Sequence, residues 1–206
     1  MPPTTVLLVD DHAVMRMGLV SLLRTCPELA VTGEAGDGES GLRTALETRP
    51  DVVIADLMMP GMDGIDLTRQ LLAQWPQAKV LILTTFGSSD ALAHALQAGA
   101  RGAVLKSADL AELRQAIAAV AHGKAYVSDE IEQIMSDDPP IPELTRRQRE
   151  ILDSCVRGLS NADIARLLSI SLPMVKEHLT GLFQKLGAAN RTEAVAIALR
   201  RHLLKL

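Results

Sequence analysis

The sequence predicts a doubly wound parallel α/β domain followed by a small all-α domain. Two observations support this. Short apolar runs alternate with helical patterns over roughly the first 120 residues, and no strand pattern follows after them. The length of 206 residues fits one or two domains of about 100–150 residues each. We expect a flavodoxin-like, five-stranded sheet in the order 2-1-3-4-5, and then four helices.

The expected strands are apolar on both faces, which is typical of a parallel sheet covered by helices on both sides. They are "VLLV" (6–9), "LAVTGEA" (29–35), "VVIA" (52–55), "KVLIL" (79–83) and "GAVL" (102–105). The segments between them have helical periodicity. In the last of these, Leu110, Leu113, Ile117 and Val120 recur at three and four residues after a possible cap at Ser107. The first domain is therefore expected to span residues 1–127.

Residues 128–143, "SDEIEQIMSDDPPIPE", predict a linker. The segment carries six acidic residues, no basic residue and three prolines. Such a composition buries little apolar surface, and the prolines oppose a continuous helix. A short helix around Ile131 to Met135 is compatible with the pattern.

Residues 144–206 predict four short helices, the second and third joined by a tight turn near Ser169–Ser171. This is a helix-turn-helix pattern. The segment holds 11 Lys/Arg against 5 Asp/Glu, a net charge of +6, whereas residues 1–143 hold 10 against 20, a net of −10. Chance scatter of surface charge is one explanation. The other explanation is that the chain has two domains with different partners, of which the basic domain binds nucleic acid.

Composition excludes several classes of protein. No apolar run approaches the roughly 18 residues that a membrane span needs, and the N-terminus lacks the positive region of a signal peptide. The cysteines, Cys26 and Cys155, are far apart and form no CxxC pair. A cytoplasmic protein without a disulfide framework or a zinc site is expected.

Polar residues end four of the expected strands. Asp10 and Asp11 follow the first strand, and Asp56 follows the third. In the order 2-1-3-4-5 these strands are neighbours, so three carboxylates meet at one edge, where Mg²⁺ would relieve their repulsion. The backbone carbonyl of Met58 is a further candidate ligand. Polar residues are common at strand ends, which is the plainer explanation.

Thr84 and Lys106 end the fourth and fifth strands at the same edge. A hydroxyl and an ammonium beside a carboxylate cluster are suitable donors to a phosphoryl group. The pattern therefore predicts a phosphoryl-accepting carboxylate, with Asp56 as nucleophile and Lys106 and Thr84 holding the phosphoryl oxygens.

Residues 4–123 resemble the receiver domain of bacterial two-component response regulators. The motifs are the strand-terminal "DD", then "DVVIADLMMPGMDG", "LTTF" and "LK", in that order. The resemblance implies that Asp56 is the phospho-acceptor, that Asp10 and Asp11 bind Mg²⁺, and that Thr84 is the switch hydroxyl and Lys106 the conserved lysine. Met58 and Phe86 are expected to flank the acceptor and to slow hydrolysis of its phosphate. Ala103 departs from the family, which usually has Tyr or Phe there to respond to phosphorylation.

Within residues 144–206, the third helix has one apolar face and one polar face. Val175, Leu179, Leu182, Phe183 and Leu186 should pack inward, and Lys176, Glu177, Thr180 and Gln184 should face outward. A polar helix after a tight turn suits the major groove of DNA, although such a helix is often merely solvated. Phosphate contacts are expected from Lys185 and Arg191.

This segment resembles the LuxR-type helix-turn-helix of the NarL/FixJ response regulators. The shared motifs are "LTRRQREIL", "GLSNADIARLLSIS", "VKEH", "KLG" and "NRTEA". The resemblance implies that Lys176, Glu177 and Thr180 read bases and that the last helix, 192–204, pairs protomers. Met174 stands where a Thr is usual, Pro173 is uncommon, and Gly181 weakens the helix interior.

The preferred interpretation is a transcription factor that a sensor histidine kinase phosphorylates at Asp56, and that binds double-stranded DNA as a homodimer when active. A phosphohydrolase with an aspartyl-phosphate intermediate is one alternative. Met58 counts against it, because such enzymes usually carry a second Asp at that position. A regulator that binds DNA without phosphorylation is another, and Ala103 keeps it open.

Overall fold

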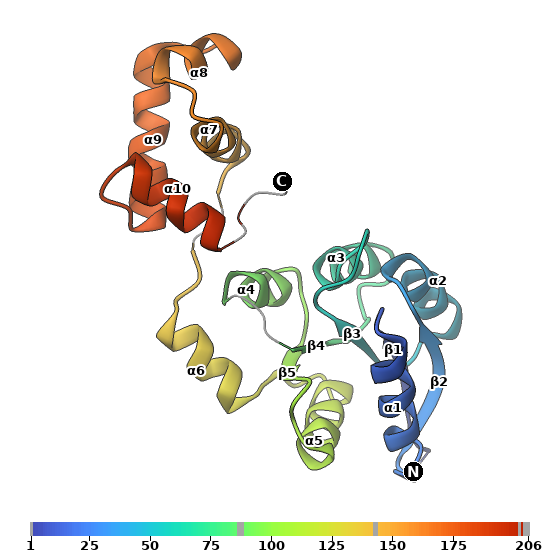
Figure 1. Cartoon of the computed structure of the whole chain (residues 1–206). Helices are drawn as coiled ribbons and strands as arrows, with labels where there is room; N and C mark the ends of the chain where they lie inside the picture. Colours follow the sequence, from blue (N-terminus) through green and yellow to red (C-terminus); the bar gives the residue numbers. More distant parts are fainter. Residues whose placement is uncertain (1, 86–88, 142–143, 202, 204–206) are drawn as a thin grey trace. The chain divides into compact units, whose positions relative to one another are not determined.

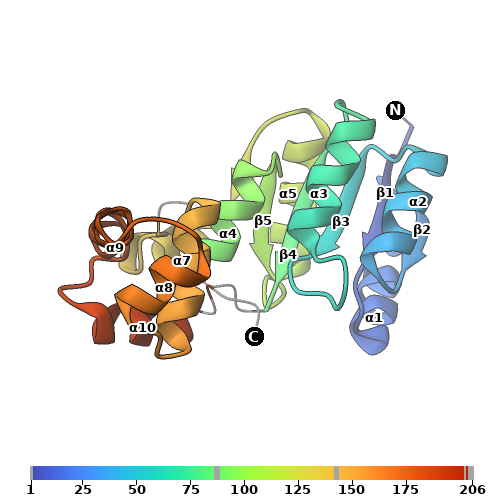
Figure 2. The ribbon, with the colours of Figure 1, turned by 90° about the horizontal axis from the view of Figure 1, so that it is seen from above.

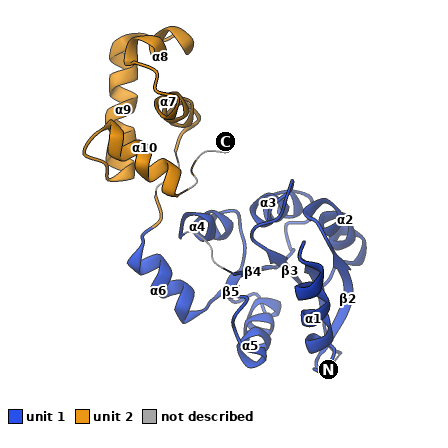
Figure 3. Cartoon of the chain, in the orientation of Figure 1, with its two compact units in different colours: residues 1–139 blue, residues 140–206 orange. Residues whose placement is uncertain are grey.

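The computed structural model describes residues 2–85, 89–141, 144–201 and 203. The chain divides into two compact units, residues 1–139 and residues 140–206 (Figure 3). Each unit has its own hydrophobic core. No helix in the described part of the chain is long and apolar enough to cross a membrane.

A parallel sheet forms the centre of the first unit (Figure 1). Its strands are β1 (Thr4–Val9), β2 (Leu29–Ala35), β3 (Val52–Asp56), β4 (Val80–Thr84), β5 (Gly102–Leu105) and β6 (Tyr126–Val127). The order is β2-β1-β3-β4-β5-β6. The expected order of the first five strands is confirmed. The sequence prediction missed β6, because this two-residue strand is recognisable only by its pairing with Gly102 and Ala103.

Helices cover both faces of the sheet (Figure 2). α1 (Ala13–Leu23) and α5 (Leu110–Ala121) pack on one face, where Val20, Leu23 and Ile117 are buried. α2 (Gly38–Thr48), α3 (Gly64–Gln74) and α4 (Ser89–Gln97) pack on the other. The cap expected at Ser107 lies two residues later, because the carboxylate of Asp109 accepts a hydrogen bond from the Glu112 amide. Central strands β3 and β4 are buried on both faces, as their apolar sequences predicted.

α6 (Asp129–Asp137) occupies most of the segment expected to be a linker, and it belongs to the first unit. Its Ile131 is fully buried and joins the core on the α4 side of the sheet, where Ile134 and Met135 also pack. The Ser128 amide donates a hydrogen bond to the Ala103 carbonyl, which aligns the start of the helix with β5. The short helix expected around Ile131 to Met135 is present, but the surface on which its apolar residues pack is not evident from the sequence.

The second unit contains α7 (Arg146–Val156), α8 (Asn161–Leu167), α9 (Leu172–Leu186) and α10 (Arg191–Arg200). Each helix begins at a side-chain cap, at Thr145, Ser160, Ser171 and Asn190 respectively. α9 ends at Gly187, whose left-handed backbone (φ 65°) terminates the helix. Val175, Leu179, Leu182 and Leu186 are buried as predicted, and Phe183 is half-buried against the same core.

Candidate functional site

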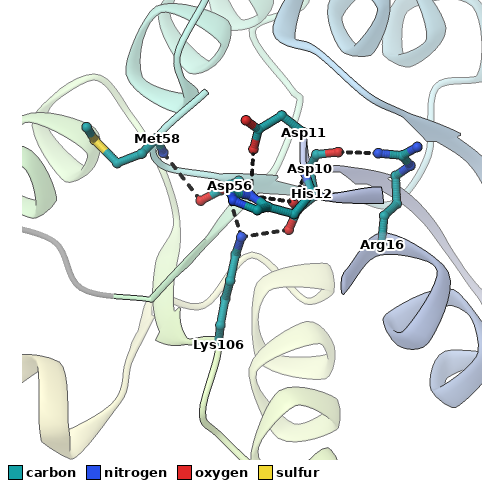
Figure 4. Close-up of polar contacts among 7 residues, drawn as sticks. All are labelled: Asp10, Asp11, His12, Arg16, Asp56, Met58 and Lys106. Carbon is teal, nitrogen blue, oxygen red and sulfur yellow. Dashed lines mark hydrogen bonds and ion pairs between the residues drawn. The ribbon is translucent and has the colours of Figure 1, made fainter. Parts of the chain in front are cut away.

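An acidic pocket lies at the carboxyl edge of the sheet, where β1 and β3 end side by side (Figure 4). Val9 pairs with Ala55, so Asp10 and Asp56 follow at adjacent positions. Both are buried, with exposed fractions of 0% and 4%. Because β1 and β3 are parallel and end at the same edge of the sheet, the two carboxylates that follow them lie together there.

Lys106 connects the two buried carboxylates. Its Nζ lies 2.7 Å from Asp10 Oδ2 and 2.7 Å from Asp56 Oδ2. Burial by itself would lower the pKa of Lys106, but its contacts with Asp10 and Asp56 raise that pKa. The ammonium therefore remains charged at neutral pH. Burial raises the pKa of Asp56, although the hydrogen bond and charge of Lys106 oppose this rise. Because burial disfavours the charged form of Asp56, a cation bound nearby would stabilise its carboxylate.

Asp11 and His12 complete the rim of the pocket. His12 Nδ1 lies 2.9 Å from Asp11 Oδ1 and 3.9 Å from Asp56 Oδ2. One potential ligand atom from each of Asp10, Asp11, His12 and Asp56 lies within 4.8 Å of the others. Carboxylate oxygens held this closely are the ligands that Mg²⁺ prefers, so the residues present fit the expected cation.

The sequence analysis gave no role to two residues that hold this rim. The His12 amide donates a hydrogen bond to Asp10 Oδ1 at 2.8 Å. Arg16 Nη1 donates to the Asp10 carbonyl oxygen at 2.6 Å, and Arg16 Nε lies 3.4 Å from Glu34 of β2. The adjacency of His12 to "DD" was a visible signal, whereas the contact of Arg16 depends on how α1 packs.

Thr84 and Met58 lie at or close to the carboxyl ends of β4 and β3. Thr84 ends β4 and is buried, and its Oγ1 has no hydrogen-bond partner among the described residues. A buried hydroxyl without a partner is uncommon, and here it leaves a donor available at the carboxyl end of β4. The Met58 amide donates to Asp56 Oδ1 at 3.3 Å, and the Met58 side chain is 62% exposed. Phe86, the other expected flanking residue, lies outside the described residues.

Ala103 is fully buried in β5, and its core also contains Ile131 of α6. The position where the resemblance leads us to expect a Tyr or Phe therefore has a methyl group, and apolar side chains of α6 pack into the same cluster. A change at this position cannot be transmitted by rotation of an aromatic ring.

The outward face of α9 carries the predicted base-reading residues. Lys176, Glu177, Thr180 and Gln184 are all exposed. The Thr180 hydroxyl donates to the Lys176 carbonyl at 3.0 Å, so one of these groups is already used within the helix.

Arg191, expected to contact phosphate, makes internal contacts instead. Its guanidinium donates to Asn161 Oδ1 at 3.3 Å and to the carbonyls of Cys155 and Leu159. These bonds hold the start of α10 against the α7–α8 connection. Lys185 is half-buried near the end of α9. Both residues are therefore less exposed than the residues on the outward face of α9.

Comparison with known proteins identifies both units. Residues 6–118 match the response regulator receiver domain, and residues 142–198 match the luxR family of bacterial regulatory proteins. The transcriptional regulatory protein LiaR of Bacillus subtilis is 37% identical over 97% of this chain and 98% of its own length. The response regulator protein VraR of Staphylococcus aureus is 34% identical over 97% and 98%.

Solved structures agree with this assignment. The response regulator ChrA of a haem-sensing two-component system is 38% identical, with a TM-score of 0.60 over 99% of this chain and 100% of that one. A complex of the response regulator RcsB with DNA is 25% identical, with a TM-score of 0.68 over 97% and 98%. The chain therefore belongs to the two-component response regulators that join a receiver domain to a LuxR-type helix-turn-helix, which are transcription regulators and not metabolic enzymes.

Proposed function

We propose that a sensor histidine kinase transfers a phosphoryl group to Asp56, and that this transfer controls how a homodimer binds double-stranded DNA through α9. The observation that carries the proposal is the set of groups around Asp56. Its carboxylate contacts the Lys106 ammonium at 2.7 Å, and Thr84 holds a buried hydroxyl that lacks a partner among the described residues. This is the donor set that an acyl phosphate at the strand edge would need.

The chemistry follows from these groups. An Asp56 oxygen attacks the phosphorus atom, the bond from phosphorus to the histidine nitrogen of the kinase breaks, and that nitrogen keeps the electron pair. Lys106 and Thr84 then donate hydrogen bonds to the phosphoryl oxygens. Mg²⁺, held by Asp10, Asp11, Asp56 and the Met58 carbonyl, would neutralise the phosphoryl charge when bound.

Two packing contacts support a route from the pocket to α6. β4 ends at Thr84 and α4 begins at Ser89, and the Ser89 hydroxyl donates a hydrogen bond to Asp138, next to the end of α6. α6 also contacts β5, the strand that contains Ala103. We infer that displacement of α4 and α6 conveys the phosphorylation state.

DNA binding is proposed through the exposed face of α9, with Lys176, Glu177, Thr180 and Gln184 as base-reading candidates. Phosphate contacts are proposed from Lys185 and Arg191, and Arg191 would make its contact by exchanging an internal hydrogen-bond partner for a phosphate oxygen. A homodimer would place two α9 helices on two half-sites. A cytoplasmic location is proposed from the two free, buried cysteines.

The test combines mass and DNA affinity in one sample. The native chain and Asp56→Asn are incubated with a small phosphodonor and Mg²⁺, and Asp66→Asn, a surface carboxylate on α3, serves as the matched control. We expect one phosphoryl group on the native chain and the control, none on Asp56→Asn, and a change in DNA affinity only where mass is gained. Salt must be held constant, because phosphate contacts make affinity steeply salt-dependent.

The possible failures are distinct. Absence of a mass gain in the native chain would remove the phosphorylation mechanism. A mass gain that leaves DNA affinity unchanged would favour the regulator that binds DNA constitutively, which is the second candidate that Ala103 supports.

A further inference from the structure

Met174 is an exposed apolar residue in the first turn of α9. Its exposed fraction is 44%, and Glu177 lies one turn later on the same outward face. The residues of a recognition helix that reach base edges are those at its N-terminal end. Met174 therefore occupies a base-reading position with a side chain that has neither charge nor a hydrogen-bond donor.

The fold of the second unit does not require this side chain. Met174 is absent from the described core, which is closed by Val175 and Leu179 on the opposite face of α9. The start of the helix is capped by Ser171, whose Oγ accepts a hydrogen bond from the Met174 amide at 3.4 Å. A Thr at position 174 would thus not be needed to cap the helix, and replacing it by Met removes a hydroxyl from the surface facing DNA.

The side-chain chemistry of Met174 determines which group of DNA it can contact favourably. A thioether side chain cannot donate to a phosphate, so it adds nothing to sequence-independent binding. In the major groove, the apolar group that distinguishes one base pair from another is the C5-methyl of thymine. Glu177, its neighbour, has the acceptor that suits a cytosine amino group.

We propose that Met174 is a specificity-determining residue that reads the methyl group of a thymine adjacent to the cytosine read by Glu177. This inference rests on the proposed DNA-binding role of α9 and adds the class of base to it. Residues 144–206 hold 11 Lys/Arg against 5 Asp/Glu. This positive charge favours DNA, rather than another protein, as the partner that contacts Met174.

The experiment first selects bound sites from a random duplex library, using the full-length chain at fixed salt. Each thymine of the selected site is then replaced by uracil, which lacks only the methyl group. For the native chain, we expect the uracil substitution at one thymine to lower the affinity about fourfold, because burying one methyl group contributes about that factor. Met174→Ser should lose this discrimination, whereas Met17→Ser, at an exposed methionine on α1 (65%), should keep it.

The outcomes separate this inference from the proposed function. If the native chain enriches no sequence, base reading by α9 fails altogether. If it enriches a site in which no uracil substitution weakens binding, or if Met174→Ser keeps the uracil effect, the reading by Met174 is overturned and base reading stands. Melting temperatures of both variants establish that they are folded.

Discussion

The Ser89 hydroxyl at the start of α4 donates a hydrogen bond to Asp138 Oδ2, next to the end of α6, at 3.2 Å. Ser89 is 1% exposed, so its hydroxyl is otherwise removed from water. Two helices that are distant in sequence, α4 following the acceptor edge and α6 leading out of the first unit, are therefore joined by a side-chain contact. This contact gives the receiver a connection to α6 that does not depend on an aromatic residue in β5.

Removing this bond should loosen the end of α6. Ser89→Ala deletes the donor, and we expect faster amide exchange over residues 134–138 with a stability loss of about 1 kcal/mol or less. Phosphoryl uptake at Asp56 should be unchanged. Hydrogen exchange followed by mass spectrometry measures the effect. Ser21→Ala, which removes a hydroxyl bonded within α1, is the control. Equal exchange of α6 in both variants would exclude the connection.

Ile131 should hold α6 on the sheet. It is fully buried in the cluster that includes Ala103. Ile131→Ala should lower the free energy of unfolding of the first unit by about 2–5 kcal/mol, because it leaves a cavity. Ile131→Val should lower it by only about 0.5–1.5 kcal/mol. Urea unfolding measures both. A loss below 1 kcal/mol for the Ala variant would mean that α6 is a peripheral element.

Lys106 and Mg²⁺ should compete for the same carboxylates. Lys106→Met leaves Asp10 and Asp56 buried without their cation, a change that costs about 3–5 kcal/mol in comparable pairs. Added Mg²⁺ should then raise the melting temperature of this variant more than that of the native chain, since the ligand-free state is the one destabilised. Lys79→Met, which removes a lysine bonded to the Ala121 carbonyl, should respond to Mg²⁺ as the native chain does. An identical response of all three proteins would contradict the competition.

Alanine substitutions at Gly181, inside α9, and at Gly187, which caps its C-terminus, should change the stability of the second unit in opposite directions. A Cβ at Gly181 would lie 3.5 Å from Gln148 Nε2, an ordinary contact. Gly181→Ala should therefore stabilise the second unit by about 0.5–1 kcal/mol, the cost of Gly in a helix interior. Gly187 has φ 65°, so Gly187→Ala should destabilise by about 1 kcal/mol. Thermal unfolding of the two variants tests the pair, and a shift of the same sign in both would refute the backbone argument.

Asp51 should make the first unit more stable at neutral than at acid pH. Its Oδ2 accepts hydrogen bonds from the Thr5 amide at 2.8 Å and the Thr5 hydroxyl at 2.7 Å, which joins the starts of β1 and β3. The bond from the Thr5 amide, and then that from its hydroxyl, lower the pKa of Asp51. A carboxyl whose pKa is lower in the folded state stabilises that state above its unfolded pKa, and this contribution is lost as the pH falls through the folded pKa.

Asp51→Asn should accordingly lower the free energy of unfolding at pH 7, by about 1 kcal/mol or less for a group this exposed. The difference from the native chain should narrow as the pH falls below about 4, near the ordinary pKa of Asp. Denaturant unfolding at pH 7 and pH 3 measures it. A difference that is independent of pH would show that ionisation of Asp51 does not stabilise the folded state.

Apolar periodicity and strand-terminal residues were sufficient to predict the first five strands and the convergence of Asp10, Asp11, Asp56 and Lys106. These are local patterns, and a parallel sheet converts them directly into position, because its strands end at one edge. The same reasoning predicted the buried face of α9, since a period of 3.6 residues determines which side chains share a face.

Tertiary structure alone decided the roles of α6 and Arg191. The acidic residues of 128–143 predicted a linker, yet Ile131 finds a partner surface on β5 and is buried there. The charge of Arg191 predicted a phosphate contact, yet its guanidinium is satisfied by Asn161 and two backbone carbonyls more than 30 residues away. Local sequence determines which groups a helix exposes along its own axis, whereas the partner that satisfies an apolar or charged side chain is chosen by packing between segments distant in the chain.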